Sequence, residues 1–196
     1  MKVRNRVDLP STIIAPSIKN VSIETNLQQL DLAKREMSLL AVFDLDYTVW
    51  PMNADQHVYH KKPLRKAENR VEDGKGRSIE LYSDIKQILE FLRAQNVTIG
   101  ISSKDCAPKL CREILEKHEI LEYFDKRLIE IYPCRSKIVQ FEKFWPHGFT
   151  PEKTIFFDDN QFNICDLQKK GVHSVLVTQR YGATLDMVKV ALKRIK

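Results

Sequence analysis

The stretch AVFDLDYTVWP, residues 41–51, joins an apolar run to two aspartates that are separated by one residue. The complete run, residues 39–43, is short and continuously apolar, as is typical of a strand buried on both faces of a parallel sheet. Runs of the same kind, rich in β-branched or aromatic residues, recur at residues 97–101, 154–157 and 174–177. The sequence therefore predicts four strands of a parallel sheet.

Helical patterns separate these strands. Pro108 suits the first turn of one helix, and Gly171 suits the left-handed end of another. Apolar residues spaced to fall on one helix face occur in three segments: Ile85, Ile88, Leu89 and Leu92; Ile138, Phe141 and Trp145; and Leu185, Val188, Leu192 and Ile195. Strands that alternate with helices predict an α/β fold, a three-layer α/β/α architecture around a doubly wound, mostly parallel sheet of the Rossmann type.

Length and composition indicate one domain with appendages, because 196 residues, 43% of them hydrophobic, can bury one core. The formal net charge of +6 suits acidic partners, among them phosphorylated substrates, nucleic acid and anionic lipid. Acidic residues interrupt the dispersed basic ones, which favours a solvated face over a nucleic-acid patch. No apolar run approaches the roughly 20 residues that cross a bilayer. We expect a monomer with no nucleic-acid partner and no membrane span.

The predicted organisation is an N-terminal extension followed by one domain that contains a short insertion. Residues 1–38 form an N-terminal extension of unassigned role, and their acidic residues count against a transit peptide. Residues 39–196 carry the repeating strands and helices. Within them, residues 53–78 are polar and contain the turn signal Gly74-Lys75-Gly76, which predicts a small hairpin flap. The four cysteines have neither a C-x-x-C pair nor zinc-ligand spacing, so free thiols in a cytoplasmic, reducing compartment are expected.

Polar side chains follow three of the predicted strands at the point where each ends. They are Asp44 and Asp46 after the first, Ser102 and Ser103 after the second, and Asp158 and Asp159 after the third. Ligands of open α/β sheets bind beyond the carboxyl ends of the strands, so these residues should share one rim. Clustered carboxylates repel one another unless a cation holds them, and oxygen ligands with few histidines favour Mg²⁺. Any single aspartate could instead cap a helix or end a strand.

Lys137, in CRSKIVQF, opens the helix that carries Ile138. A lysine in the first turn of a helix is usually solvated, and the position is slightly unfavourable to the helix dipole. If the side chain turns to the rim, it supplies the positive charge that a transferring phosphoryl group needs.

Taken in order, these residues resemble the motifs of the haloacid dehalogenase superfamily of phosphohydrolases. The matching positions are Asp44-Leu45-Asp46-Tyr47-Thr48, Ser103, Lys137 and Asp158-Asp159. The fuller stretches FDLDYTVWP, EIYP, SKI and IFFDDNQFNI resemble the magnesium-dependent phosphatase-1 family within it. The match runs from residue 39 almost to the C-terminus, so the resemblance implies a phosphatase domain at residues 39–196 with a minimal cap.

The resemblance implies a phosphoaspartyl mechanism. Asp44 is expected to be the nucleophile, and Asp46 the general acid and then the base. Mg²⁺ would be held by Asp44, the backbone carbonyl of Asp46 and an acid of the Asp158-Asp159 pair, with Asp159 favoured. The residues expected to serve phosphate binding are Ser103, Lys104, Lys137 and, as a support of the loop, Thr48.

Two departures from the family pattern bear on the phosphate contacts. Lys104 stands where an arginine commonly follows the serine, and a lysine lacks the bidentate fork of a guanidinium. The segment Cys134-Arg135-Ser136 is one residue longer than the pattern before the lysine. Arg135 either replaces a lost phosphate contact or faces solvent, and we favour solvent.

The short insertion implies an open cleft and leaves the substrate undecided. Trp50, Asp55 and His57 resemble family positions near the substrate, although a solvated loop histidine is the commoner case. Phosphotyrosine-like groups on proteins and sugar phosphates, free or protein-attached, are both compatible. Two other functions stay open: a phosphotransferase, and a receiver-like binding module, which would not need the acid at Asp46.

Overall fold

A five-stranded parallel sheet forms the centre of the computed structural model, which describes residues 39–67 and 70–195. Its strands are β1 (Leu40–Phe43), β5 (Thr98–Ser103), β6 (Ile129–Ile131), β7 (Thr154–Asp158) and β8 (His173–Leu176). The spatial order is β6-β5-β1-β7-β8, so the first strand lies in the middle. The predicted α/β fold is confirmed, whereas the N-terminal extension predicted at residues 1–38 lies outside the described residues.

The central place of β1 explains why residues 39–43 are continuously apolar. Leu40 is level with Thr98 of β5 on one side and with Thr154 of β7 on the other. All four residues of β1 are buried. Ala41 and Phe43 face one hydrophobic cluster, and Leu40 and Val42 face the other, as the alternation of side chains along a strand requires.

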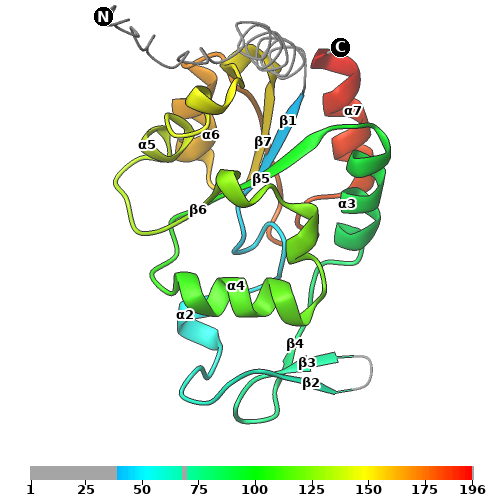
Figure 1. Ribbon diagram of the computed structural model, residues 1–196, viewed down its shortest axis with the longest axis vertical. Helices are drawn as coiled ribbons and strands as arrows, with labels where there is room; N and C mark the ends of the chain where they lie inside the picture. The colour runs from blue at the N-terminus through cyan, green and yellow to red at the C-terminus, as the bar shows by residue number, and fades with distance from the viewer. Residues whose placement is uncertain (1–38, 68–69, 196) are drawn as a thin grey trace, which may run out of the picture.

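Helices cover both faces of the sheet (Figure 1). One face carries α3 (Ile85–Ala94) and α7 (Leu185–Ile195), and the other carries α5 (Ile138–Phe141) and α6 (Gln161–Gln168). The helix α4 (Pro108–Lys117) lies between the sheet and the flap, and its apolar residues join the cluster of α3. Gly171 has a φ of 87° just after α6, which confirms the predicted left-handed end. None of the described helices is long and apolar enough to span a membrane.

Two features differ from the sequence prediction. The helix predicted from Ile138 to Trp145 ends at Phe141, and Trp145 instead begins a 3₁₀ turn with Pro146. The Trp145 ring still packs on Phe141, with 5.9 Å between ring centroids. The spacing of Ile138, Phe141 and Trp145 therefore reflects a shared hydrophobic core and not one continuous helix. The edge strand β6 was not predicted, because three residues carry too little periodic signal.

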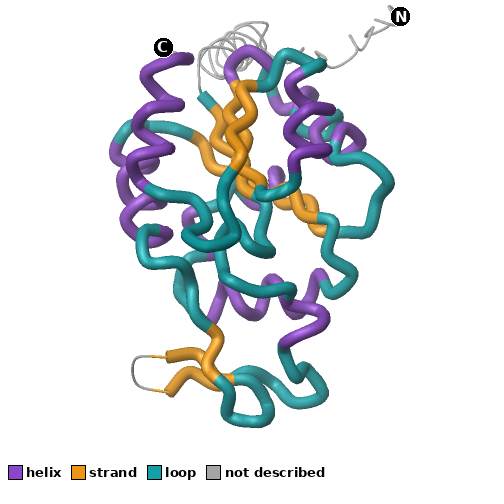
Figure 2. The backbone as a smooth tube through the Cα atoms, turned by 180° about the vertical axis from the view of Figure 1, so that it is seen from behind, coloured by secondary structure: helices purple, strands orange, loops and turns teal. Residues whose placement is uncertain are grey.

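The insertion after β1 is larger than a hairpin. It comprises the short helix α2 (Ala54–His57) and an antiparallel sheet of β2 (Arg65–Ala67), β3 (Arg70–Glu72) and β4 (Ser78–Ile79). We call this small sheet and its turns the flap; it projects away from the main sheet (Figure 2). Its second turn is organised by the buried carboxylate of Asp73, which accepts hydrogen bonds from three backbone N–H groups and from Arg77.

Candidate active site

The loop after β1 places both aspartates of the opening motif at the end of the sheet. Tyr47, which lies between Asp46 and Thr48, has a φ of 56°, and this left-handed conformation reverses the chain sharply. The turn is closed by the carbonyl of Leu45, which accepts hydrogen bonds from the N–H groups of Thr48 and Val49 at 3.1 and 2.8 Å. Thr48 is fully buried and its carbonyl accepts from Ala183 N–H. Thr48 is therefore placed to support the loop and does not line the cleft described below.

Three carboxylates from two neighbouring strands converge beside this loop. Asp44 continues β1 and donates its N–H to the carbonyl of Phe157 at 2.9 Å, which brings it next to the end of β7. Asp44, Asp158 and Asp159 each offer an oxygen within 4.8 Å of the others. Because they sit at the carboxyl ends of paired parallel strands, residues more than a hundred positions apart share one rim, as the sequence predicts.

Lys137 is held between these acids rather than in solvent. Its side chain is 1% exposed, and Nζ lies 2.5 Å from Asp44 Oδ1 and 2.7 Å from Asp158 Oδ2. The third ammonium proton is satisfied by the carbonyl of Ser102 at 2.6 Å. A buried cation is tolerated only when it is paired and hydrogen-bonded. This placement removes the usual interpretation of a first-turn lysine as a solvated side chain.

Burial and charge act in opposite directions on this pair. Burial raises the pKa of Asp44, while the Lys137 ammonium opposes the rise. Burial lowers the pKa of Lys137, but the carboxylates of Asp44 and Asp158 outweigh it and raise the pKa above its ordinary value. The lysine is therefore cationic throughout the neutral range, which keeps a fixed positive charge at the rim.

Asp46 has a different environment from Asp44. Its Oδ1 accepts hydrogen bonds from Trp50 Nε1 at 2.7 Å and from Ala54 N–H at 3.1 Å. Burial raises the pKa of Asp46 to about 6, these two hydrogen bonds lower it in part, and the nearby Asp105 adds to the rise. A carboxyl group with such a pKa can both donate and accept a proton near neutrality. Trp50 is fully buried, so it acts on Asp46 and does not line the cleft.

The two acids at the end of β7 differ in how much of each carboxylate is already used. Asp158 is fully buried and accepts from Lys137, from Asn160 N–H at 2.7 Å and from Asn163 Nδ2 at 3.0 Å. Asp159 is partly exposed and accepts from Gln179 Nε2 at 2.7 Å. Asp159 therefore keeps more free oxygen lone pairs directed to the rim.

These groups line a cleft of about 280 Å³, which we call the active cleft. Ser103, Lys104, Asp55 and the acids Asp44, Asp46, Asp158 and Asp159 contribute to its walls. Lys104 Nζ donates to Asn163 Oδ1 at 2.9 Å, so part of its hydrogen-bonding capacity is committed. His57 does not line the cleft. It is exposed at the end of α2, where Nδ1 lies 2.8 Å from the carbonyl of Asn53.

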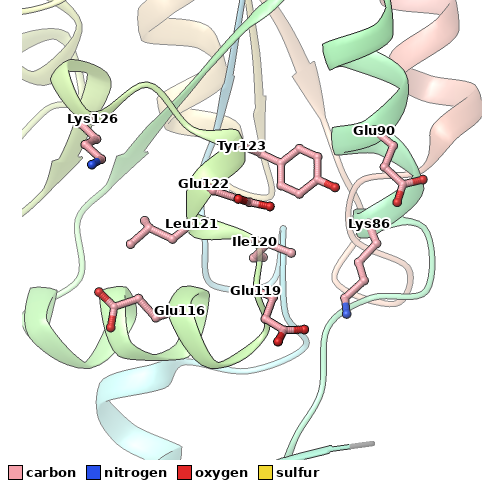
Figure 3. A pocket seen from close by; sticks show the side chains of 9 residues that line it. All are labelled: Lys86, Glu90, Glu116, Glu119, Ile120, Leu121, Glu122, Tyr123 and Lys126. Atoms are coloured by element: carbon pink, nitrogen blue, oxygen red, sulfur yellow. The ribbon is translucent and has the colours of Figure 1, made fainter.

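A larger groove lies elsewhere. It has a volume of about 730 Å³ and runs between α3 and the end of α4, with Ile120, Leu121 and Tyr123 between charged side chains (Figure 3). None of the predicted site residues lines it. The larger volume of this groove therefore does not mark the candidate active site. The smaller active cleft is the candidate because the carboxylates and Lys137 converge there.

Gln140 is a site residue that the sequence analysis missed. Its side chain is fully buried; Oε1 accepts from Ser102 Oγ at 2.6 Å, and Nε2 donates to the carbonyl of Ser103 at 2.7 Å. It thereby fixes the end of β5 to the turn that carries Lys137. A glutamine three residues after Lys137, on the same helix face, was the available signal. Asn163, which accepts from Lys104 and donates to Asp158, was also missed.

The donor set suits a hard divalent cation. The cluster consists of three carboxylates within reach of one another, and no histidine or cysteine of the described residues belongs to it. Such oxygen ligands are those that Mg²⁺ takes in proteins. The partly exposed Asp159 offers access from the cleft, and Lys137 offsets part of the repulsion between the other two. The residues present therefore fit a magnesium ion.

Comparison with known proteins agrees with this geometry. The profile of the acid phosphatase family matches residues 36–196. The chain belongs to this family. It is 37% identical over 137 residues to magnesium-dependent phosphatase 1 of Homo sapiens, a match that covers 68% of this chain and 74% of the relative. It is 34% identical over 139 residues to a HAD-like hydrolase superfamily protein of Schizosaccharomyces pombe, which covers 65% of this chain and 79% of that protein.

Solved structures support the fold. A haloacid dehalogenase superfamily hydrolase from Ehrlichia chaffeensis matches with a TM-score of 0.54 at 14% identity, over 82% of this chain and 100% of that one. The phosphatase domain of a Bacteroides fragilis protein, crystallised with Mg, matches with a TM-score of 0.54 at 15% identity, over 91% of this chain and 46% of that one. The resemblance to the haloacid dehalogenase superfamily and its magnesium-dependent phosphatase-1 family is confirmed.

Proposed function

We propose that this member of the acid phosphatase family is a Mg²⁺-dependent phosphomonoesterase that works through a phosphorylated Asp44. The observation that carries the proposal is the position of Lys137, which contacts both Asp44 and Asp158 at the rim where Asp159 is also found. Homologues named as magnesium-dependent phosphatases support both the reaction class and the cofactor.

Asp44, the backbone carbonyl of Asp46 and Asp159 would hold the magnesium ion. We favour Asp159 over Asp158 because hydrogen bonds from Lys137, Asn160 and Asn163 already occupy the Asp158 carboxylate. When bound, the ion supplies positive charge that screens the phosphate oxygens from the surrounding carboxylates.

Asp44 provides the first half of the reaction. One of its carboxylate oxygens attacks the phosphorus, an acyl phosphate bond forms, and the bond from phosphorus to the leaving oxygen breaks. Asp46 donates its proton to that oxygen, so the alcohol or phenol departs neutral. The raised pKa of Asp46, about 6, is in the direction that this role requires.

Hydrolysis of the acyl phosphate completes the cycle. Asp46, now ionised, accepts a proton from a water molecule whose oxygen attacks the phosphorus. The acyl phosphate bond breaks, which releases inorganic phosphate and returns Asp44 to its carboxylate form and Asp46 to its acid form. We propose that Ser103 contacts a phosphoryl oxygen from the cleft wall. Lys137, whose ammonium protons go to Asp44, Asp158 and the carbonyl of Ser102, would contribute its positive charge, which stabilises the transition state. Lys104 would contribute from the cleft wall while its link to Asn163 restrains it.

The active cleft is open to leaving groups of different kinds. With a volume of about 280 Å³ and no large cap in the described chain, it accepts a phosphate group presented on a protein as well as a small sugar phosphate. Phosphotyrosine-like groups and sugar phosphates therefore both belong to the proposal. Asp55 lies on the cleft wall where a leaving group would pass. His57 lies outside the cleft, beside the carbonyl of Asn53, so we give it no role in substrate binding. A monomeric state and a cytoplasmic location stay predictions.

Hydrolysis of para-nitrophenyl phosphate by the purified chain tests the function. We expect release of nitrophenol with Mg²⁺, none with EDTA, and a loss of about a thousandfold or more in Asp44→Asn, because removing a covalent step costs several kcal/mol. Asp186→Asn, which removes an exposed carboxylate outside the cleft, is the control and should retain full activity.

Product analysis separates the alternatives. Equal amounts of nitrophenol and inorganic phosphate indicate a hydrolase, and a deficit of phosphate in the presence of alcohols indicates a phosphotransferase. A stable phosphoprotein without turnover would indicate the receiver-like module. Full activity with EDTA would remove the metal from the mechanism.

A further inference from the structure

The loop that follows β8, residues 177–184, contacts the rim of the active cleft through one side chain. Gln179 in this loop donates from Nε2 to Asp159 Oδ2 at 2.7 Å. Gln179 itself does not line the active cleft, so any effect that it has on the site passes through Asp159. Because the Asp159 carboxylate is partly exposed, this hydrogen bond restrains a group that solvent would otherwise leave free to rotate.

The other acids of the rim are oriented in a different way. Lys137 contacts the carboxylates of Asp44 and Asp158, and both of these acids are buried. Asp159 has no such ion pair within the described chain, and no side chain of the described residues other than Gln179 donates a hydrogen bond to it. The orientation of the third carboxylate of the cluster therefore depends on Gln179.

Tyr82 fixes the backbone of Gln179. It is a buried residue between the flap and α3, and its hydroxyl donates to the carbonyl of Gln179. The Tyr82 ring also packs closely on Gly182, which has a φ of 62°. A Cβ added at Gly182 would lie 2.1 Å from Tyr82 Cδ2, so only glycine leaves room for the ring. The loop is thus held at Gln179 and again three residues later.

Two further hydrogen bonds join these segments to the turn that follows Asp44. The N–H of Tyr82 donates to the carbonyl of Val49 at 3.0 Å, and the N–H of Ala183 donates to the carbonyl of Thr48 at 3.0 Å. The loop that carries Gln179 is therefore attached to the same turn that places the proposed nucleophile. This arrangement sets the position of the Gln179 amide relative to the carboxylate cluster.

We propose that Gln179 is a positioning residue of the magnesium site, which orients the Asp159 carboxylate for the cation. Its amide holds Oδ2 and leaves Oδ1 to the ion. The inference rests on the proposed function, because it takes Asp159 as a direct ligand of Mg²⁺. Loss of a group that orients a metal ligand typically lowers metal affinity 10–100-fold, and we expect about tenfold here because Gln179 is exposed.

The rise in Tm that Mg²⁺ produces, followed by circular dichroism without substrate, tests the inference. A cation that binds the folded state raises Tm according to its concentration relative to its Kd. Gln179→Met keeps the length of the side chain and removes the donor. Each variant is compared with its own Tm in EDTA at constant ionic strength, so a simple loss of stability does not count. We expect Gln179→Met to need about tenfold more Mg²⁺ than the parent for the same rise.

Two other variants sharpen the result. Tyr82→Phe removes only the hydroxyl that holds the Gln179 carbonyl, so it should shift the Mg²⁺ requirement in the same direction by a smaller factor. Gln168→Met is the matched control, because Gln168 is also exposed and donates to the carbonyl of Ser174 at 3.3 Å, outside the active cleft. It should respond to Mg²⁺ as the parent does. In the hydrolysis assay, excess Mg²⁺ should restore the turnover of Gln179→Met.

The outcomes separate this inference from the proposed function. A parent chain whose Tm does not respond to Mg²⁺ would overturn the proposed metal site and the inference with it. A normal response in the parent and an unchanged one in Gln179→Met would overturn the inference alone. So would equal weakening in Gln168→Met, which would show a general effect of losing a glutamine. An unchanged response in Asp159→Asn would remove the ligand through which Gln179 acts, and turnover that stays low in excess Mg²⁺ would exclude a role in metal affinity.

Discussion

The loss of stability in Lys137→Met tests whether Lys137 forms a buried ion pair, because breaking a buried pair costs more than breaking a pair at the surface. The substitution keeps the length of the side chain but leaves Asp44 and Asp158 buried without their common cation, and leaves the carbonyl of Ser102 without its donor. Removing one partner of a buried pair costs roughly 3–5 kcal/mol. For a domain of this size, 1 kcal/mol shifts Tm by about 2–4 °C, so Tm should fall by about 6–20 °C.

Lys143→Met is the matched control. Lys143 Nζ lies 2.7 Å from Glu130 Oε2, a distance like those of Lys137, but its side chain is 54% exposed. Exposed pairs contribute roughly 0–1 kcal/mol, so Tm should fall by at most about 4 °C. Both variants and the parent chain would be melted by circular dichroism at neutral pH with EDTA.

The pH dependence gives a second readout. Burial and the nearby Asp158 charge raise the pKa of Asp44 while Lys137 opposes the rise, so without Lys137 the folded-state pKa of Asp44 lies further above the unfolded value of about 3.9. The folded state then binds more protons than the unfolded state, so stability rises as pH falls through the raised pKa of Asp44. The Tm deficit of Lys137→Met should therefore shrink at mildly acidic pH. A Tm within the range of the Lys143→Met control, or a deficit that grows in acid, would refute the buried charge cluster.

Three further substitutions test the surroundings of the site. Trp50→Phe removes the N–H that donates to Asp46 and helps to lower its pKa, so the alkaline limb of the pH–rate profile should move up by about one unit; an unmoved limb would exclude Asp46 as the acid. Gln140→Leu should cost about 1–3 kcal/mol in urea melts and lower kcat/KM, and unchanged kinetics would deny it a positioning role. Burial raises the pKa of Asp73, but hydrogen bonds from Tyr59 and Arg77 outweigh it and hold the pKa well below its usual range. Asp73→Asn should therefore cost about 1–3 kcal/mol at neutral pH, with a difference that narrows in strong acid as the parent carboxylate becomes protonated; a constant difference would contradict this.

The fold could be predicted from the sequence to the extent that each element carries its own pattern. Residues 39–43 read as a buried strand because every residue is apolar, and α3 was evident from four apolar positions on one face. The strand β6 and the end of α5 were not evident, because three or four residues hold too little pattern to separate them from a loop. In the insertion, one turn signal was visible, but the pairing of three strands depends on contacts that no local signal records.

The same distinction applies to the candidate site. Asp44, Asp46, Ser103, Asp158 and Asp159 could be placed at one rim because each follows an apolar strand, and parallel strands end at the same edge. Their separate chemical environments could not be predicted. Nothing in the sequence near Trp50 indicates that its indole donates to Asp46. In the sequence, Gln140 cannot be distinguished from a polar residue on an exposed helix face. Each acquires its role only when the main chain brings its partner within hydrogen-bonding distance.

The sequence by itself determined the alternation of strands and helices and the types of side chain at the strand ends, since both are properties of short segments. The tertiary structure alone decided the strand order, the burial of Lys137 against an aspartate 93 residues away, and the contact of Gln179 with Asp159. The physical reason is that burial and charge pairing depend on which segments meet in space. One lysine in the first turn of a helix is unremarkable until the sheet places two carboxylates and a carbonyl around it.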